Sequence, residues 1–211
     1  MTARRRPWFT APRFSSLLGV LIGAAGACVY FAAGQIWPAS IAVVLAMLAT
    51  ALLDAAAEPA ADTAADTAAD GKAVTERTTH LKSLGLVFAV LIKYSALMAL
   101  SSASLPLALP PTLVLGLIMI AGHAASRALA AFVKPASPGD LGIALIVGVA
   151  PAALIGIPGL IGIAAAIAAR MLLVALAPRV RALVSAGRPE LIRQSTEICF
   201  YLGALAAWAY A

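Results

Sequence analysis

The sequence has little charge, only two cysteines and none of the common catalytic motifs. Lysine and arginine number 15 and aspartate and glutamate 9, together 11% of 211 residues, whereas soluble domains carry about 25%. Cys28 and Cys199 lie in apolar segments without the spacing of metal ligands. The sequence contains no Walker loop, no CxxC pair and no Ser/His/Asp pattern. These absences exclude an ordinary soluble domain and the enzyme classes that depend on those motifs.

Apolar residues dominate the chain. They make up 63% of it, and the mean hydropathy is +0.98. Residues 14–53, 94–126 and 141–169 contain no charged side chain, and each stretch exceeds the roughly 20 residues that cross a bilayer. The sequence therefore predicts a polytopic membrane protein. Its net charge of +6 indicates no nucleic-acid partner, because the basic residues lie beside the spans.

The hydropathy pattern predicts an all-α membrane bundle of about seven helices in a single integral membrane domain, residues 1–211. Lipid offers no hydrogen-bond partner to the backbone, so the spans must be helical. The predicted spans are residues 15–34, 36–53, 84–102, 111–133, 141–155 and 158–177, with a last span that ends at residue 211. Proline-containing breaks separate them. Residues 141–155 are short and are also compatible with one arm of a re-entrant hairpin.

Lysine and arginine predict the orientation. Twelve basic residues fall on one side of the predicted membrane: Arg4, Arg5, Arg6, Arg13, Lys72, Arg77, Lys82, Lys134, Arg179, Arg181, Arg188 and Arg193. The opposite loops carry no charge, so the positive-inside tendency places the amino terminus in the cytoplasm and the carboxyl terminus outside. We expect an inner-membrane protein with two cytoplasmic loops, an acidic one at 54–83 and a basic one at 178–193.

The acidic loop holds five acids spaced by four residues, namely Asp54, Glu58, Asp62, Asp66 and Asp70. On a helix this spacing stacks carboxylates on nearly one face, where they repel one another. A shared Mg²⁺ ion would relieve the repulsion and bridge to substrate phosphates. The alternative is a solvated low-complexity linker, because the Ala-Ala-Asp-Thr tetrad repeats.

The layout resembles the cobalamin synthase family, the adenosylcobinamide-GDP ribazoletransferases. The similar segments are residues 13–24, 41–53, 62–71, 86–97, 123–128 and 193–203. Residues 62–71 match the family motif Asp-Gly-Leu-Ala-Asp-Thr-Ala-Asp-Gly with one inserted residue, and 123–128 match its Ser-Arg pattern. Two later motifs differ: the family's Asp-Ser-Arg-x-Gly corresponds to residues 75–79, which keep only the arginine, and its Gly-Gly-x-Thr-Gly-Asp-x-x-Gly-Ala to residues 182–191.

The resemblance implies an activity at the cytoplasmic face of the membrane. The expected reaction joins adenosylcobinamide-GDP and α-ribazole to give adenosylcobalamin and GMP, with Mg²⁺ as cofactor, in the last steps of cobalamin biosynthesis. By matching residues, it implies that Asp62, Asp66 and Asp70 bind the metal and the pyrophosphate. Arg77 would clamp a phosphate, since a guanidinium offers paired donors.

Charged residues inside the spans are a second group of candidates. Lys93 lies near the middle of the third span, where an unpaired ammonium costs several kcal/mol. In one interpretation Lys93, Arg127 and Arg170 surround a substrate anion. In the other, the two arginines reach the interface and Lys93 pairs with a buried acid or carbonyl. We expect Arg170 to reach the membrane surface. Glu197 matches a family position and either orients a substrate hydroxyl or pairs with a basic residue.

Alternatives to the transferase remain. A CDP-alcohol phosphotransferase also uses carboxylates and Mg²⁺, but Asp66 and Asp70 are one residue too far apart for its Asp-x-x-Asp-Gly motif. The changed family motifs favour a catalytically silent paralogue that acts as a membrane scaffold. The predicted partners are membrane lipid and the two substrates, and a homo-oligomer is compatible with this layout.

Overall fold

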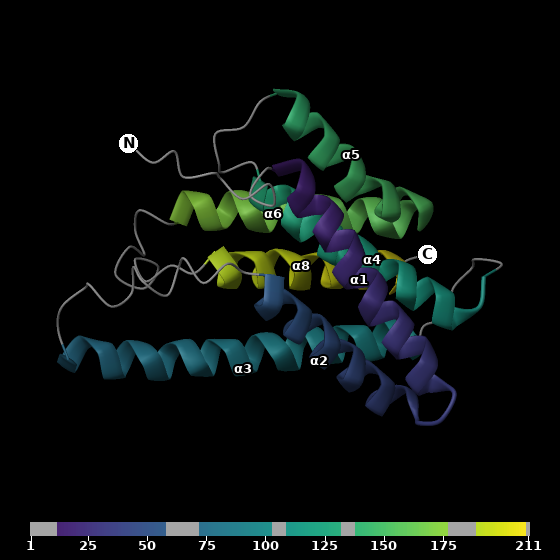
Figure 1. Ribbon diagram of the computed structural model, residues 1–211, viewed down its shortest axis with the longest axis horizontal. Helices are drawn as coiled ribbons and strands as arrows, with labels where there is room; N and C mark the ends of the chain where they lie inside the picture. The colour runs from purple at the N-terminus through teal and green to yellow at the C-terminus, as the bar shows by residue number, and fades with distance from the viewer. Residues whose placement is uncertain (1–11, 58–71, 103–108, 132–137, 177–188, 210–211) are drawn as a thin grey trace, which may run out of the picture.

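The computed structural model describes residues 12–57, 72–102, 109–131, 138–176 and 189–209. These residues form α-helices and no strand (Figure 1). The helices are α1 (Pro12–Gly34), α2 (Ala39–Ala57), α3 (Lys72–Ser102), α4 (Pro111–Ala131), α5 (Pro138–Leu154), α6 (Ile157–Leu176) and α8 (Pro189–Ala209). The prediction of an all-α membrane bundle is confirmed.

Five of these helices, α1, α2, α3, α4 and α6, are long and apolar enough to cross a membrane. Helix α5 is apolar but shorter, with 17 residues and Pro151 in its interior. Helix α8 is 21 residues long, and its first half carries charged side chains. Large apolar side chains are exposed on several helices, as Leu21, Phe88 and Met171 are. Such surfaces suit contact with lipid, so the chain is an integral membrane protein.

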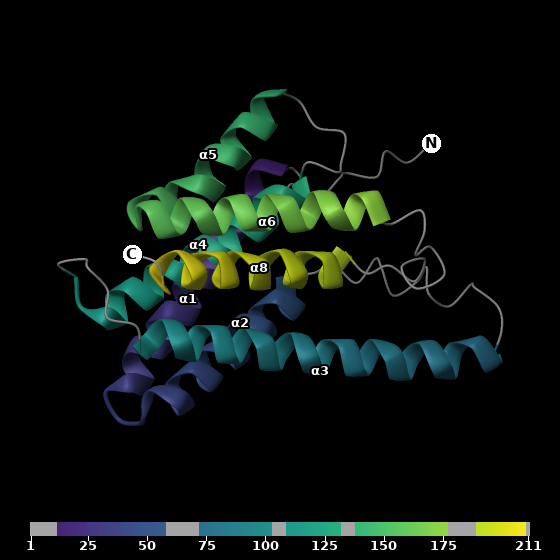
Figure 2. The ribbon, with the colours of Figure 1, turned by 180° about the vertical axis from the view of Figure 1, so that it is seen from behind.

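Helix α4 is the centre of the bundle. It packs against α1, α3, α5, α6 and α8, and every residue from 121 to 128 is buried. The core joins apolar side chains of α4 to Val43 on α2, Leu97 on α3 and Phe200 on α8. Helices α3, α6 and α8 run nearly parallel in space, and α1 and α2 cross them at an angle (Figures 1 and 2). Any polar side chain on the inner face of α4 is therefore enclosed by several helices.

Two helices begin earlier than hydropathy predicts. Helix α3 begins at Lys72 rather than at residue 84, and its first turns extend beyond the ends of α6 and α8 (Figure 2). Residues 72–83 are polar but rich in helix formers, and hydropathy detects only the apolar part of such a helix. Helix α8 likewise begins at Pro189, inside the predicted basic loop.

A tight turn joins α5 and α6. Gly156 has φ of +80°, which lies in the left-handed region that glycine enters without a Cβ penalty. The two helices pack against each other and form a helical hairpin. The short connection predicted between these segments is thus present.

Candidate functional site

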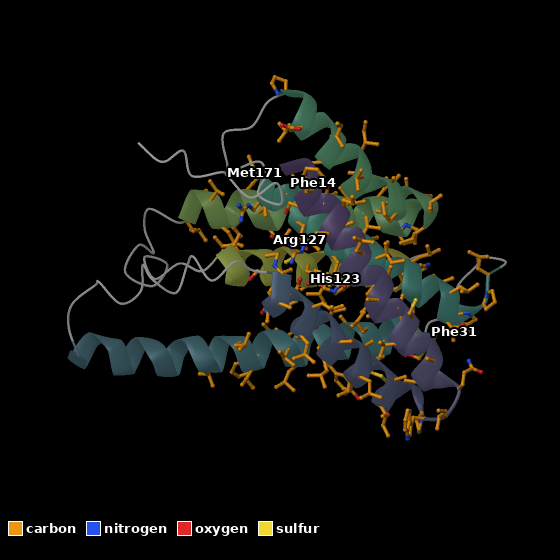
Figure 3. All side chains as sticks on the ribbon, in the orientation of Figure 1. Phe14, Phe31, His123, Arg127 and Met171 are labelled. Atoms are coloured by element: carbon orange, nitrogen blue, oxygen red, sulfur yellow. The ribbon has the colours of Figure 1, made fainter. Side chains whose placement is uncertain are left out.

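Charged side chains from four helices meet inside the bundle. They form two groups, which we call the Asp54 cluster (Asp54, Arg127 and Arg193) and the Glu197 cluster (Lys93, His123, Glu197 and Tyr201). Together the two clusters make the charge ladder. Figure 3 shows His123 and Arg127 near the middle of the bundle, whereas Phe31 and Met171 lie at its periphery. Hydrophobic packing therefore surrounds the most polar part of the described chain.

Helix periodicity produces the ladder. Arg193, Glu197 and Tyr201 are spaced by four residues on α8, and His123 and Arg127 by four on α4, so each set shares a helix face. One such step rises about 6 Å along the axis. Asp54 lies in the last turn of α2, and Lys93 is within α3. The polar groups of the four helices thus lie at the same levels along the bundle axis, where they contact one another.

In the Asp54 cluster, two guanidinium groups meet one carboxylate. Arg127 Nη2 donates a hydrogen bond of 2.6 Å to Asp54 Oδ1, and Arg193 Nη1 lies 2.7 Å from the same oxygen. All three residues are more than nine-tenths buried. The Nε atom of Arg127 is buried and has no hydrogen-bond partner among the described residues. The Nε atom of Arg127 can therefore donate to an anion.

In the Glu197 cluster, three groups approach one oxygen of the buried carboxylate. Lys93 Nζ lies 2.7 Å from Glu197 Oε1, and the Tyr201 hydroxyl donates to the same atom over 2.7 Å. His123 Nε2 lies 3.2 Å from it, but neither ring nitrogen of His123 has a hydrogen-bond partner in the described structure. The ammonium also lies 6.0 Å from the centre of the Tyr201 ring, within the range of a cation–π interaction.

Small residues allow α1 and α8 to reach α4 at this level. A Cβ added to Gly19 on α1 would lie 2.6 Å from the carbonyl oxygen of His123. A Cβ added to Gly122 would lie 2.6 Å from Tyr201 Cε1. Helix α1 therefore packs almost backbone to backbone on α4, and the Tyr201 ring of α8 packs on the backbone of α4 at Gly122, as small residues permit in membrane bundles.

The residues predicted for the site fall into two sets. Lys93, Arg127 and Glu197 come together in the charge ladder, where Lys93 pairs with Glu197, and their binding of substrate stays a prediction. Asp62, Asp66 and Asp70 lie outside the described residues, so the predicted Mg²⁺ site stays a prediction as well. Arg77 belongs to α3, but its side chain is outside the described part. Among the described residues, no group of three potential metal ligands occurs.

Sequence reasoning did not single out Asp54, Arg193, His123 or Tyr201 for the site. Asp54 belongs to the series of acids, yet the family motif was matched at residues 62–71. A usable signal was available, because Asp54 and Glu58 have the four-residue spacing of the first two aspartates in that motif. Arg193 was counted only as a determinant of orientation. Its spacing from Glu197 and Tyr201 was the other available signal.

Comparison with known proteins gives one informative match. The chain is 33% identical over 130 residues to adenosylcobinamide-GDP ribazoletransferase from Shewanella amazonensis. Over this region the chain is therefore similar to a member of the cobalamin synthase family. The matched region covers 57% of this chain and 47% of the relative, so the chain spans about half the length of the curated relative it matches. No protein-family model matches the chain, and no solved structure does.

Proposed function

We propose that this protein is a membrane transferase that joins adenosylcobinamide-GDP to α-ribazole, giving adenosylcobalamin and GMP. The observation that carries the proposal is the charge ladder, found in a chain that resembles a ribazoletransferase. Ionisable residues inside a membrane domain are expensive and mark functional sites by default. The ladder is therefore the first place to look for substrate binding.

The position of the ladder favours an enzyme over a transport path. On α8, the residues after Tyr201 are apolar as far as Ala209, and on α4 the residues between Thr112 and His123 are apolar. Asp54 lies at the end of α2 that leads into the acidic segment. The described charges thus occupy one half of the bundle, and charge confined to one face suits a surface-facing enzyme rather than a path through the membrane. The distribution of lysine and arginine supports placing that face in the cytoplasm, at the inner membrane.

In the proposed reaction, a ribazole hydroxyl oxygen forms a bond to the corrinoid-linked phosphorus, and the phosphorus–oxygen bond to GMP breaks. The hydroxyl proton passes to solvent. Arg127 and Arg77 bind phosphate oxygens through paired donors. Lys93 adds positive charge deeper in the membrane domain than Arg77. Glu197 holds Lys93 and Tyr201 in place, as their contacts with its Oε1 atom indicate.

Magnesium is the proposed cofactor. The carboxylates of Asp62, Asp66 and Asp70 are oxygen donors, the ligand type that Mg²⁺ prefers. When bound, Mg²⁺ would neutralise charge on the departing phosphate.

The decisive experiment measures GMP release by the purified protein in detergent, given both substrates and Mg²⁺. We expect release from the wild type and a loss of about 100-fold or more for Asp66→Ala, the scale set by removal of one transition-state-stabilising group. Thr67→Ala, a neighbouring change that leaves every carboxylate, should retain activity. Chelation should abolish release and added Mg²⁺ should restore it. A wild type that releases no GMP would refute the proposal.

A catalytically silent scaffold is the second candidate. Two observations favour it: residues 75–79 keep only the arginine of a family motif, and both described carboxylates of the ladder pair with basic side chains. A scaffold would retain a stable fold without releasing GMP, and Asp66→Ala would change nothing.

A further inference from the structure

The connection between α5 and α6 carries no polar side chain. Residues 141–169, which include the turn and most of both helices, consist only of alanine, glycine, isoleucine, leucine, proline and valine. Leu154 and Ile157 stand on either side of the turn and are 71% and 73% exposed. A connection that faces water is normally polar. The exposed turn therefore has the surface of a segment that lies in lipid.

Both arms of this hairpin are short when they are measured from the turn to their charged residues. Helix α5 has 17 residues and rises about 25 Å, whereas the hydrocarbon core of a bilayer is about 30 Å thick. Asp140 lies fourteen residues before Leu154, and Arg170 lies thirteen after Ile157, so each charge is about 20 Å from the turn. Both charged residues are partly exposed, and such side chains favour the membrane boundary. With both charges at one boundary of the hydrocarbon core, the turn ends about 10 Å short of the other.

The backbone of the turn can enter lipid because its polar groups are bonded or enclosed. The non-helical residues between the two helices are Ile155 and Gly156. Ile155 is buried, and its N–H donates over 3.1 Å to the carbonyl oxygen three residues earlier. Gly156 donates to the oxygen three residues earlier and accepts from the Leu160 N–H, both over 3.1 Å. Pro158 has no N–H to satisfy. Irregular backbone is tolerated at membrane depth under such conditions.

The turn also stops short of a neighbouring helix. At the same end of the bundle, the beginning of α4 extends further along the long axis than the turn does (Figures 1 and 2). The connection between α1 and α2, at that end as well, contains the exposed amide of Gln35, a group that suits water. The connections at this end therefore differ in depth as well as in polarity.

We propose that α5 and α6 form a re-entrant hairpin whose tip, residues 154–157, ends inside the bilayer and is covered by lipid acyl chains. The inference goes beyond the proposed function and does not depend on it, because it rests on the apolar turn, the short arms and the bonded backbone. A tip in water, or one under a second protein chain, is the outcome that the experiments must separate from lipid.

The first experiment measures the access of water to the tip. In a variant without Cys28 and Cys199, Ile157→Cys and Gln35→Cys are each treated with a membrane-impermeant maleimide, in intact cells and in cells opened by freezing and thawing. The thiolate is the reactive form and hydrocarbon excludes charge, so Ile157→Cys should label at least about tenfold more slowly than Gln35→Cys in both. Labelling after denaturation verifies that both thiols are present. Labelling of Ile157→Cys as fast as Gln35→Cys, from either side, overturns the proposal.

The second experiment identifies what covers the tip. Ile157→Trp is made with Trp8, Trp37 and Trp208 replaced by phenylalanine, and the protein is reconstituted in phosphatidylcholine brominated near the middle of its acyl chains. The reference variant keeps Trp37 as its single tryptophan, in the connection between α1 and α2. Bromine should quench the emission of Ile157→Trp more strongly than that of Trp37, because a tryptophan at the boundary lies at headgroup level. A tip that is protected from maleimide but weakly quenched would be covered by protein, such as a second copy of this chain, and would overturn the assignment to lipid.

Discussion

At the scale of single residues, Glu197 holds the inner half of the ladder together. Lys93 Nζ, the Tyr201 hydroxyl and His123 Nε2 all lie within 3.2 Å of its Oε1 atom. Glu197 is only 2% exposed. A buried charge that loses its partner is strongly unfavourable, whereas replacement of both partners by uncharged groups is often tolerated. The interaction between Lys93 and Glu197 can therefore be measured by a double-mutant cycle.

Glu197→Gln should lower the free energy of unfolding by about 3–5 kcal/mol, because it leaves the Lys93 ammonium without its carboxylate. Lys93→Met should be destabilising for the converse reason. The double variant should lose clearly less than the sum of the two, since neither buried charge remains. Thermal unfolding in detergent, followed by circular dichroism, measures all three. Strictly additive losses would show that the two side chains do not interact.

Gly122→Ala should disturb the same cluster by steric means. The added Cβ would lie 2.6–2.8 Å from Tyr201 Cε1, Cζ and Oη, so the ring must shift and its hydrogen bond to Glu197 must lengthen. We expect a loss of about 1–3 kcal/mol in stability, typical of overpacking. The matched control is Gly85→Ala, whose Cβ would meet nothing within 4 Å. Equal midpoints for the two variants would contradict the packing at Tyr201.

Sequence reasoning selected three residues of the ladder, two of them because each is a lone charge in an apolar span. Lys93 and Arg127 were identified because charge is costly there, and Glu197 because it matched a family position. Asp54 and Arg193 were not selected, since each lies at a helix end where charge is ordinary. Their burial depends on the neighbouring helices, which no local property of the sequence reports.

At the scale of helices, the contact between α1 and α4 brings the ladder close to the backbone of α1. A Cβ on Gly23 would lie 2.6 Å from Ile120 Cα and 3.0 Å from the Met119 carbonyl oxygen. Backbone atoms cannot move aside as side chains can. The spacing of Gly19 and Gly23 therefore sets how closely the two helices approach.

Gly23→Ala should separate α1 from α4 and lower the thermal midpoint, by about 2–4 °C for each kcal/mol lost. Gly34→Ala is the control in the same helix, because its Cβ would meet nothing within 4 Å. Comparison of the two melting curves in detergent tests the prediction. If Gly34→Ala is as destabilising as Gly23→Ala, close packing is not the cause.

Helix positions were largely predictable, and helix starts were less so. The ends of α1 and α3 at Gly34 and Ser102 agree with the predicted spans, because apolar stretches end there. The polar first turns of α3 were assigned to a loop. Hydropathy detects only the apolar residues that prefer lipid. The backbone hydrogen bonds of a helix continue past those residues into water, so a polar first turn is missed.

At the scale of the whole molecule, the predicted orientation can be tested by cysteine labelling. In a variant without Cys28 and Cys199, Gln35→Cys places a thiol in the short connection between α1 and α2. Ala69→Cys places one in the acidic segment. A membrane-impermeant maleimide should label Gln35→Cys in intact cells, and Ala69→Cys only after the membrane is opened. Labelling of Ala69→Cys in intact cells would place the acidic segment outside.

The sequence was sufficient for the membrane class, the helical architecture and most helix limits, because these depend on composition and on properties of consecutive residues. The partners within the ladder required the tertiary structure. Asp54 and Arg127 are 73 residues apart, and their pairing depends on which faces of α2, α4 and α8 meet. Helix faces are set by glycine contacts and side-chain shape, so the enclosure of these charges follows from packing rather than from hydropathy.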